Sequence, residues 1–382
     1  MESTSNYWVS VYDILEDAGI EVYLVNARYA KGVPGKKTDI CDAQWIQELH
    51  RYGLLKKSFR PEKEIRPFRY LMRHRRECTE SACKELLLLQ KVLTEMNIHL
   101  HHVFSDLDGK NSLMIIESIL SGERDAEKLI ALRMPNCCAP KQKILDALQG
   151  DYRDEYLFVL KQSYQRWQYS RDNIHECDKL IATLIAKIEP EQAAGNAVGG
   201  LKKKRATKNE IDAPIALESY RIYGVDLARV DGIGVNLMAM LLSELGTRQS
   251  ILKHFKNQHH LSSWLGMCPD NRISGGKILR AKTRKVKSRL AGAFRLAAFS
   301  LSRSNSKLGD YCRRMRAKLG KAEGITATAH KLIRIVYRMI LEQKSYDEER
   351  AFKQTAQTKR NRLRSVTAQA AQLGYTLSPM AA

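Results

Sequence analysis

The chain has 382 residues, 44% of them hydrophobic, which is enough for two or three domains with apolar cores. Its 64 Lys and Arg residues against 42 Asp and Glu give a net charge of +22, and this excess favours a polyanionic partner, above all nucleic acid. No apolar run approaches the roughly 18 residues that cross a membrane, and no signal peptide opens the chain. These features exclude a membrane or secreted protein and predict a soluble, cytoplasmic one.

The eight cysteines are scattered along the chain, and none forms a CxxC pair. Cys137 and Cys138 are adjacent, a spacing that fits neither a zinc site nor a disulfide framework. We therefore expect reduced thiols.

The N-terminal residues predict a helix followed by a strand. Residues 11–15 have a helical pattern, and residues 19–26 alternate apolar and polar positions with β-branched content. Because no later stretch has a convincing β pattern, we expect the partners of this strand to be absent. The predicted fold class is mainly α with an N-terminal α/β remnant.

Two carboxylates lie at the start of the next predicted helix, which Thr38 or Asp39 caps and Gly53 closes. Asp39 and Asp42 are at positions i and i+3, so both project from one face. Carboxylates this close repel each other unless a cation lies between them, which indicates a Mg²⁺ site. The alternative is that they simply complement the helix dipole.

The middle of the chain predicts helices from residue 62 to about 104, from 111 to 120, and in three further segments up to 188. The last of these, from residue 154, carries an apolar heptad seam typical of core or oligomer contacts. Its members are Leu157, Leu160, Tyr164, Trp167 and Ile174. Residues 189–214 are rich in Ala, Gly and Lys, which predicts a flexible basic linker at a domain boundary.

A helix-hairpin-helix pattern follows the linker. Residues 227–242 combine apolar positions with Gly-Ile-Gly, and Ala239 lies five places after the second glycine. Gly232 and Gly234 would expose backbone N–H groups to a phosphate, a contact that grips DNA without reading its sequence. Similar hairpins also serve as packing units, and the pattern leaves both interpretations open.

The stretch Pro-Asp-Asn-Arg-Ile-Ser-Gly-Gly-Lys at 269–277 places Ser274 beside Gly275 and Gly276. Two glycines allow positive φ and close approach to a ligand, so this hydroxyl is a candidate nucleophile for a DNA phosphodiester. The alternative is a glycine turn in a solvated basic loop. The nearby cations predicted to contact nucleic acid are Arg272, Lys277, Arg280, Lys282, Arg284, Lys285, Lys287 and Arg289.

Basic charge is concentrated around this motif. Residues 272–321 contain 16 Lys and Arg and one acidic residue, a local balance of +15, which is about two-thirds of the net charge in about one-eighth of the length. Apolar positions predict an amphipathic helix that faces the core on one side and phosphate on the other. They are Val286, Leu290, Phe294, Ala298 and Leu301. A final helical pair is predicted at 325–343 and 350–373.

Four segments in this order resemble the insertion-sequence transposases of the IS-one-ten (IS110) family. They are NYW…VNARYAKGVPGKKTDICDAQWIQELHRYGLL, SFRPEKEIRPFRYLMRHRRE, RVDGIGVNLMAMLLSELG and LSSWLGMCPDNRISGGK, and the resemblance extends to Gly374 and Tyr375. It implies a RuvC-like, RNase H-type N-terminal domain with a D-E-D-D set that binds Mg²⁺, a helical coiled-coil region, and a C-terminal domain with a nucleophilic serine. It also implies a structured guide RNA that pairs with donor and target DNA, a homo-oligomer, and a bacterial, nucleoid-associated location.

By this resemblance, Asp39 and Asp42 match the last two acids of the set, Glu2 matches the second, and Ser274 matches the serine. The family's first aspartate lies upstream of the M-E-S-T box at which this chain begins, so we expect the first strands and that ligand to be missing. The expected domains are a partial RuvC-like domain at 1–105, a coiled-coil region at 106–188, a linker at 189–214 and a transposase domain at 215–382.

The expected function is DNA transposition and recombination, with Ser274 as the nucleophile and Mg²⁺ assisting phosphoryl transfer. A second hypothesis is a catalytically inactive truncated copy that only binds DNA and RNA. A third, a nuclease similar to Holliday-junction resolvases, would need all four acids and no serine.

Overall fold

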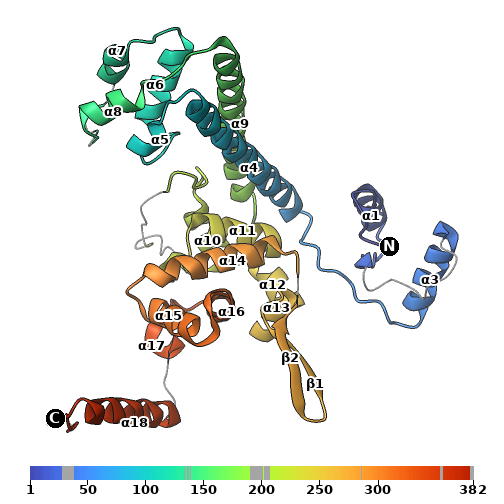
Figure 1. The fold of residues 1–382 in the computed structure, drawn as a ribbon. Coiled ribbons are helices and arrows are strands. Elements are labelled where there is room, and N and C mark those ends of the chain that lie inside the picture. Colours follow the sequence, from blue (N-terminus) through green and yellow to red (C-terminus); the bar gives the residue numbers. More distant parts are fainter. Residues whose placement is uncertain are drawn as a thin grey trace. The chain divides into compact units, whose positions relative to one another are not determined.

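The computed structural model describes residues 1–27, 38–132, 134–135, 137, 139–189, 201, 207–284, 286–352 and 356–378. The protein is mainly helical, as the sequence predicts (Figure 1). The chain divides into two compact units, Met1–Glu62 and Lys63–Ala382. Among the described helices, none combines the length and the apolar character that crossing a membrane requires.

The N-terminal unit contains α1 (Trp8–Asp17) and α3 (Asp39–Arg51). The prediction of a regular strand at 19–26 is wrong for this structure. The described residues there form one isolated parallel bridge, between Glu2 and Val25. A strand needs a neighbour along its whole length to satisfy its backbone groups, and here the pairing stops after one residue.

A small apolar core supports this unit. Tyr12, Val22 and Leu24 are buried against one another. Arg60 covers this core, with its guanidinium carbon 4.1 Å from the centre of the Tyr12 ring and Nη2 2.8 Å from a carboxylate oxygen of Asp13. Cation–π contact and the ion pair together fix the segment that follows α3 onto α1.

The second unit begins with two long helices, α4 (Ile65–Glu95) and α9 (Asp154–Ala186). Arg75 pairs with Asp178 and Glu85 with Arg166, so the helices run antiparallel. The predicted heptad seam of α9 is confirmed as core, because Leu160, Tyr164, Trp167 and Ile174 are buried. The stretch predicted to be helical from 62 to about 104 is mostly helical but contains a break, because α4 ends at Glu95 and the next helix begins at Leu100.

Four short helices close the end of this two-helix hairpin and share its core, as Figure 1 shows. They are α5 (Leu100–Val103), α6 (Lys110–Leu120), α7 (Ala126–Ala131) and α8 (Lys141–Ala147). α6 coincides with the predicted helix at 111–120. The predicted linker at 189–214 lies largely outside the described residues, which omit 190–200 and 202–206.

The C-terminal part of the unit is a cluster of helices around α16, which packs on α12, α13, α14 and α15. Its members are α10 (Ile215–Tyr223), η1 (Leu227–Arg229), α11 (Val235–Leu245), α12 (Arg248–His254), α13 (Gln258–Trp264), α14 (Arg289–Ser300), η2 (Leu301–Arg303), α15 (Lys307–Leu319), α16 (Lys321–Glu342) and α17 (Glu348–Ala351). The last helix in the chain is α18 (Ala356–Gln372). The helix predicted to include Val286 begins at Arg289, because Ser288 caps it by accepting a hydrogen bond from the Ala291 N–H.

One β-hairpin projects from these helices, formed by β1 (Pro269–Ser274) and β2 (Lys277–Thr283). The prediction that no later stretch forms β structure is therefore wrong. Gly275 and Gly276 form the connection with φ of +53° and +73°. Positive φ at both positions of a two-residue loop is the type I′ geometry whose twist matches antiparallel strands.

Candidate nucleic-acid interface

The β1–β2 hairpin places Ser274 at its free end. Ser274 is opposite Lys277 across the turn, and Arg272 is opposite Arg280. All residues of both strands are exposed except the half-buried Thr283. Like charges directly opposite each other destabilise an antiparallel ladder, so the pair of arginines favours an anion beside the hairpin.

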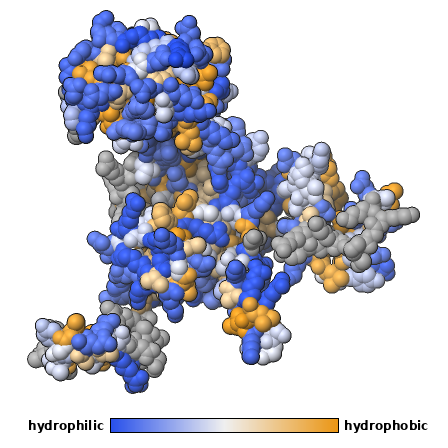
Figure 2. All heavy atoms as spheres, in the orientation of Figure 1, coloured by the Kyte–Doolittle hydropathy of each residue, from blue (hydrophilic) through white to orange (hydrophobic). Residues whose placement is uncertain are grey.

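Apolar side chains accompany the cations on this hairpin. Ile273, Ile278 and Leu279 are 62%, 60% and 69% exposed. Figure 2 shows an apolar patch at the free end of the hairpin and hydrophilic residues between this patch and the rest of the protein. A two-stranded hairpin is at best marginally stable alone in water, so this mixture of cationic and apolar groups favours a partner surface. A β-ribbon of this kind fits the major groove of DNA.

The base of the hairpin is anchored, in contrast to its tip. Nη2 of Arg284 donates to the Ser263 carbonyl oxygen at 2.5 Å and lies 3.2 Å from the Ser263 hydroxyl oxygen. Gly266 has a φ of +67°, and a Cβ there would lie 2.6 Å from Cγ2 of Val286. These contacts hold the hairpin on α13. Arg284, which the sequence predicts to contact nucleic acid, thus also anchors the hairpin through its hydrogen bond to Ser263.

Cys268 and His330 meet under the hairpin base, with Sγ 3.8 Å from Nε2. Burial raises the pKa of the Cys268 thiol, although Arg284 and Arg334 act in the opposite direction. Burial, with Arg334 and His259, lowers the pKa of His330. The raised pKa disfavours the thiolate form of Cys268, so the pair lacks the activated thiolate of a cysteine nucleophile.

The sequence interpretation missed cations that α16 contributes to this region. Nε of Arg334 is buried and has no hydrogen-bond partner among the described residues. Burial, together with Arg334 and Arg314, lowers the pKa of Lys331. The signal in the sequence is the i, i+4 spacing of His330 and Arg334, which puts both on one face of α16.

Few carboxylates neutralise the basic segment at 272–321. Among its described residues, which leave out the predicted contact Lys285, the one ion pair is between Arg313 and Asp310, at 2.5 Å. Lys277, Lys282, Lys287 and Arg289 are exposed. Unpaired, solvent-exposed cations at this density produce a strong positive potential, which attracts a polyanion.

The two glycines of the predicted helix-hairpin-helix have different surroundings. Gly232 has a φ of +85°, and a Cβ there would lie 3.0 Å from the Ala297 carbonyl oxygen, so it packs closely against α14. Gly234 precedes α11 in open space. Packing is thus one role of the hairpin, and phosphate binding at the start of α11 stays a prediction.

The predicted metal ligands all lie in the N-terminal unit. Asp39 and Asp42 are exposed in the first turn of α3, and the predicted cap is confirmed, because Thr38 accepts a hydrogen bond from the Cys41 N–H at 3.2 Å. Glu2 accepts a hydrogen bond from the Thr4 hydroxyl. The structure does not bring the three carboxylates within 4.8 Å of one another. Among the described residues, the group of possible metal ligands that meets this limit is His99, His101 and His102.

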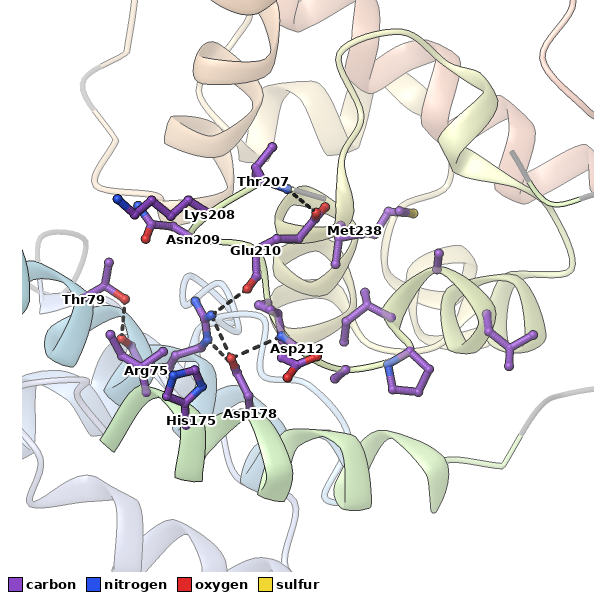
Figure 3. Close-up of a pocket in the computed structure, with 18 of the residues that line it drawn as sticks. Arg75, Thr79, His175, Asp178, Thr207, Lys208, Asn209, Glu210, Asp212 and Met238 are labelled. Atoms are coloured by element: carbon purple, nitrogen blue, oxygen red, sulfur yellow. Dashed lines mark hydrogen bonds and ion pairs between the residues drawn. The ribbon is translucent and has the colours of Figure 1, made fainter. Parts of the chain in front are cut away.

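A cavity of about 1110 Å³ lies between the α4–α9 pair and the residues that precede α10. Figure 3 shows Arg75 and Asp178 together at its wall. Nε and Nη2 of Arg75 lie 2.5 and 3.0 Å from the two carboxylate oxygens of Asp178, and Nη2 also donates to the Glu210 carbonyl oxygen at 3.3 Å. The Asp212 N–H donates to Asp178 at 3.2 Å. The Arg75–Asp178 pair therefore connects the two long helices to the segment at 207–214, and we call this connection the joint.

An exposed cationic β-ribbon on a mainly helical, strongly basic scaffold defines a nucleic-acid-binding protein. Comparison with family models gives its identity more closely. Residues 1–98 match a DEDD-type model described as transposase, and residues 226–313 match the transposase IS116/IS110/IS902 family. The chain therefore belongs to the IS110 family of transposases. No curated protein matches it.

Proposed function

We propose that the chain cleaves and rejoins DNA, with Ser274 as the nucleophile. The observation that carries this proposal is the position of Ser274 at the exposed tip of the β1–β2 ribbon. The two glycines beside it are unobstructed, because a Cβ added at either position would have no atom within 4 Å. The Ser274 hydroxyl gives up its proton as Oγ attacks the phosphorus, and the deoxyribose oxygen leaves and takes up a proton. The phosphoserine link keeps the bond energy for rejoining. Trapping of this link as a protein–DNA adduct on a denaturing gel tests the proposal.

The cations of the hairpin would hold the DNA backbone. We expect Arg272→Ala/Arg280→Ala to weaken DNA binding and to lower the slope of log K against log[salt] by about 2, because two phosphate contacts are lost. Fluorescence anisotropy with labelled duplex at several salt concentrations measures this slope. Arg338→Ala is the control, because Arg338 pairs with Glu342 at 3.3 Å. Equal slopes in both variants would show that the arginines do not touch phosphate.

Mg²⁺ is the proposed cofactor, with Glu2, Asp39 and Asp42 as its ligands. Two exposed carboxylates in one helical turn offer the hard oxygen ligands that this ion takes. When bound, the ion would neutralise charge on the reacting phosphate. Asp39 and Asp42 would position the ion, because the Thr38 cap fixes the first turn of α3 that carries both carboxylates.

We expect Asp39→Asn/Asp42→Asn to abolish the increase in Tm of the protein that Mg²⁺ produces and to lower cleavage at least about 10²-fold. Glu48→Gln, an exposed acid later in α3, is the matched control. A Mg²⁺ effect on Tm that is the same in the unmodified chain and the double variant would remove these carboxylates from the metal site.

The proposed partners are the ends of the insertion sequence, target DNA, a structured guide RNA and further copies of the chain. The unneutralised +15 segment supports the nucleic-acid partners. A second candidate function, binding of DNA and RNA without chemistry, is favoured by one observation, that the three carboxylates are not gathered within 4.8 Å. Absence of a covalent adduct in the unmodified chain, with binding retained, would decide for this candidate.

A further inference from the structure

Three histidines converge just after the end of α4. His99, His101 and His102 each have a ring nitrogen within 4.8 Å of the others. The rings of His101 and His102 have centres 4.2 Å apart, and that of His99 is 5.3 Å from His102. His99 and His101 are half-buried, and His102 is exposed. None of these residues belongs to the proposed DNA site.

The backbone that carries them is fixed by the way α4 ends. Asn97 adopts a φ of +58°, and the Ile98 N–H donates to the Leu93 carbonyl oxygen at 2.7 Å, which is the long hydrogen bond of a Schellman motif. The His99 N–H donates to the Ala147 carbonyl oxygen at 2.9 Å, across to α8. Because Ile98 and Leu100 are fully buried on either side of His99, this backbone is rigid.

A network of side chains selects the tautomer of His99. The Asn97 amide Nδ2 donates to the Gln149 carbonyl oxygen at 2.9 Å, which points Oδ1 toward the His99 ring. That oxygen is 3.1 Å from His99 Nε2 and only accepts, so Nε2 carries the proton. Nδ1 is then the nitrogen with the lone pair. It is buried and has no hydrogen-bond partner.

The His99 ring has a buried nitrogen without a partner and lies beside two further imidazoles, and three imidazoles this close together can supply the ligands of a metal site. A ligating histidine usually donates its other ring N–H to an oxygen acceptor, and Oδ1 of Asn97 is that acceptor for Nε2 of His99. Metal–nitrogen bonds of about 2.0–2.1 Å in a tetrahedron separate the ligand nitrogens by about 3.3 Å, so small side-chain rotations would close the remaining distance.

We propose that His99, His101 and His102 bind a borderline divalent transition-metal ion, with Zn²⁺ as the reference ion and water as the fourth ligand. Three neutral nitrogen ligands suit Zn²⁺, Ni²⁺ and Cu²⁺, whereas Mg²⁺ takes oxygen ligands. A bound ion would tie α5 to the end of α4 and fix the closed end of the α4–α9 hairpin. Since the ion binds the folded chain, it raises the Tm of the protein.

Titration of the untagged, reduced full-length chain with ZnCl₂ in a calorimeter tests the proposal. We expect one tight equivalent that excess Mg²⁺ does not displace, and loss of this equivalent in His101→Ala/His102→Ala. His259→Ala/His260→Ala removes an exposed adjacent pair from α13 and should bind as the unmodified chain does. The metal-free Tm of each variant, followed by circular dichroism, confirms that it folds.

Asn97→Gly tests the supporting bond, because glycine keeps the positive φ and removes the amide. We expect it to weaken Zn²⁺ binding about 10–100-fold without loss of the equivalent. A Co²⁺ absorption spectrum of nitrogen and oxygen ligands, without thiolate bands, would agree with the histidine set. Failure of the unmodified chain to bind one equivalent, equal binding by His101→Ala/His102→Ala, or thiolate bands in the Co²⁺ spectrum would each overturn the proposal.

Discussion

Ser274→Ala should abolish the covalent protein–DNA adduct and lower strand cleavage by about 10⁴-fold or more, while DNA affinity stays nearly unchanged. The alanine removes the Oγ that forms the bond to phosphorus. It leaves the backbone pairing of Ser274 with Lys277 and the turn glycines in place. Because phosphate contacts come from the neighbouring cations, binding does not depend on the hydroxyl.

The measurement uses end-labelled donor and target DNA with the guide RNA, quenched in detergent and separated on a denaturing gel, with anisotropy for affinity. Asn271→Ala is the matched control, since Asn271 is an exposed polar residue of the same strand that the mechanism does not use. Equal loss of binding and cleavage in Ser274→Ala would indicate a structural serine. Cleavage that persists in this variant would favour a nuclease that relies on its acids alone.

The sequence predicts local features of this fold well, because they depend on residues close together in the chain. Thr38 caps α3, Gly53 follows its end with a φ of +68°, and the seam of α9 is buried. Each of these signals is a short-range pattern with a direct backbone or packing consequence. The glycine pair at 275–276 predicts a turn that uses positive φ, and both residues adopt it.

The sequence does not reveal the hairpin around those glycines, and the reason is physical. Strands are recognised by alternation of buried and exposed residues, and β1 and β2 are exposed on both faces, so they have no such alternation. Pairing here is held by backbone hydrogen bonds and by the turn geometry, which composition does not report. The stretch at 19–26 is the opposite case, since it has the alternation of a strand, but among its described residues only Val25 forms a β-bridge.

Other parts of the site depend on contacts between distant residues. The charge of Arg334 on α16 opposes the burial that raises the pKa of Cys268, and Asn97 supports His99 while it is held by Gln149, which is 52 residues away from Asn97. No pattern in a single segment contains these relations. They follow from the packing of apolar faces, which brings polar groups together at positions that periodicity alone does not give.

The joint between the long helices and the C-terminal helices gives the largest expected effect on stability. Asp178→Asn should lower the free energy of unfolding by about 3–5 kcal/mol, because the Arg75 guanidinium is left buried without its charge partner. The two side chains are 9% and 4% exposed, so water does not replace the lost carboxylate. Urea denaturation followed by circular dichroism measures the change.

Glu85→Gln is the matched control, because its partner Arg166 bridges the same two helices with a side chain that is 49% exposed. Because the Arg166 end of this pair is open to water, we expect it to contribute only about 0–1 kcal/mol. Arg75→Met/Asp178→Leu should recover most of the stability lost in Asp178→Asn, since no buried charge remains. If Asp178→Asn and Glu85→Gln lowered the free energy of unfolding equally, the Arg75–Asp178 pair would not be the joint. If the double variant were less stable than Asp178→Asn, the hydrogen bonds to Glu210 and Asp212, and not the charge, would hold the segment at 207–214 in place.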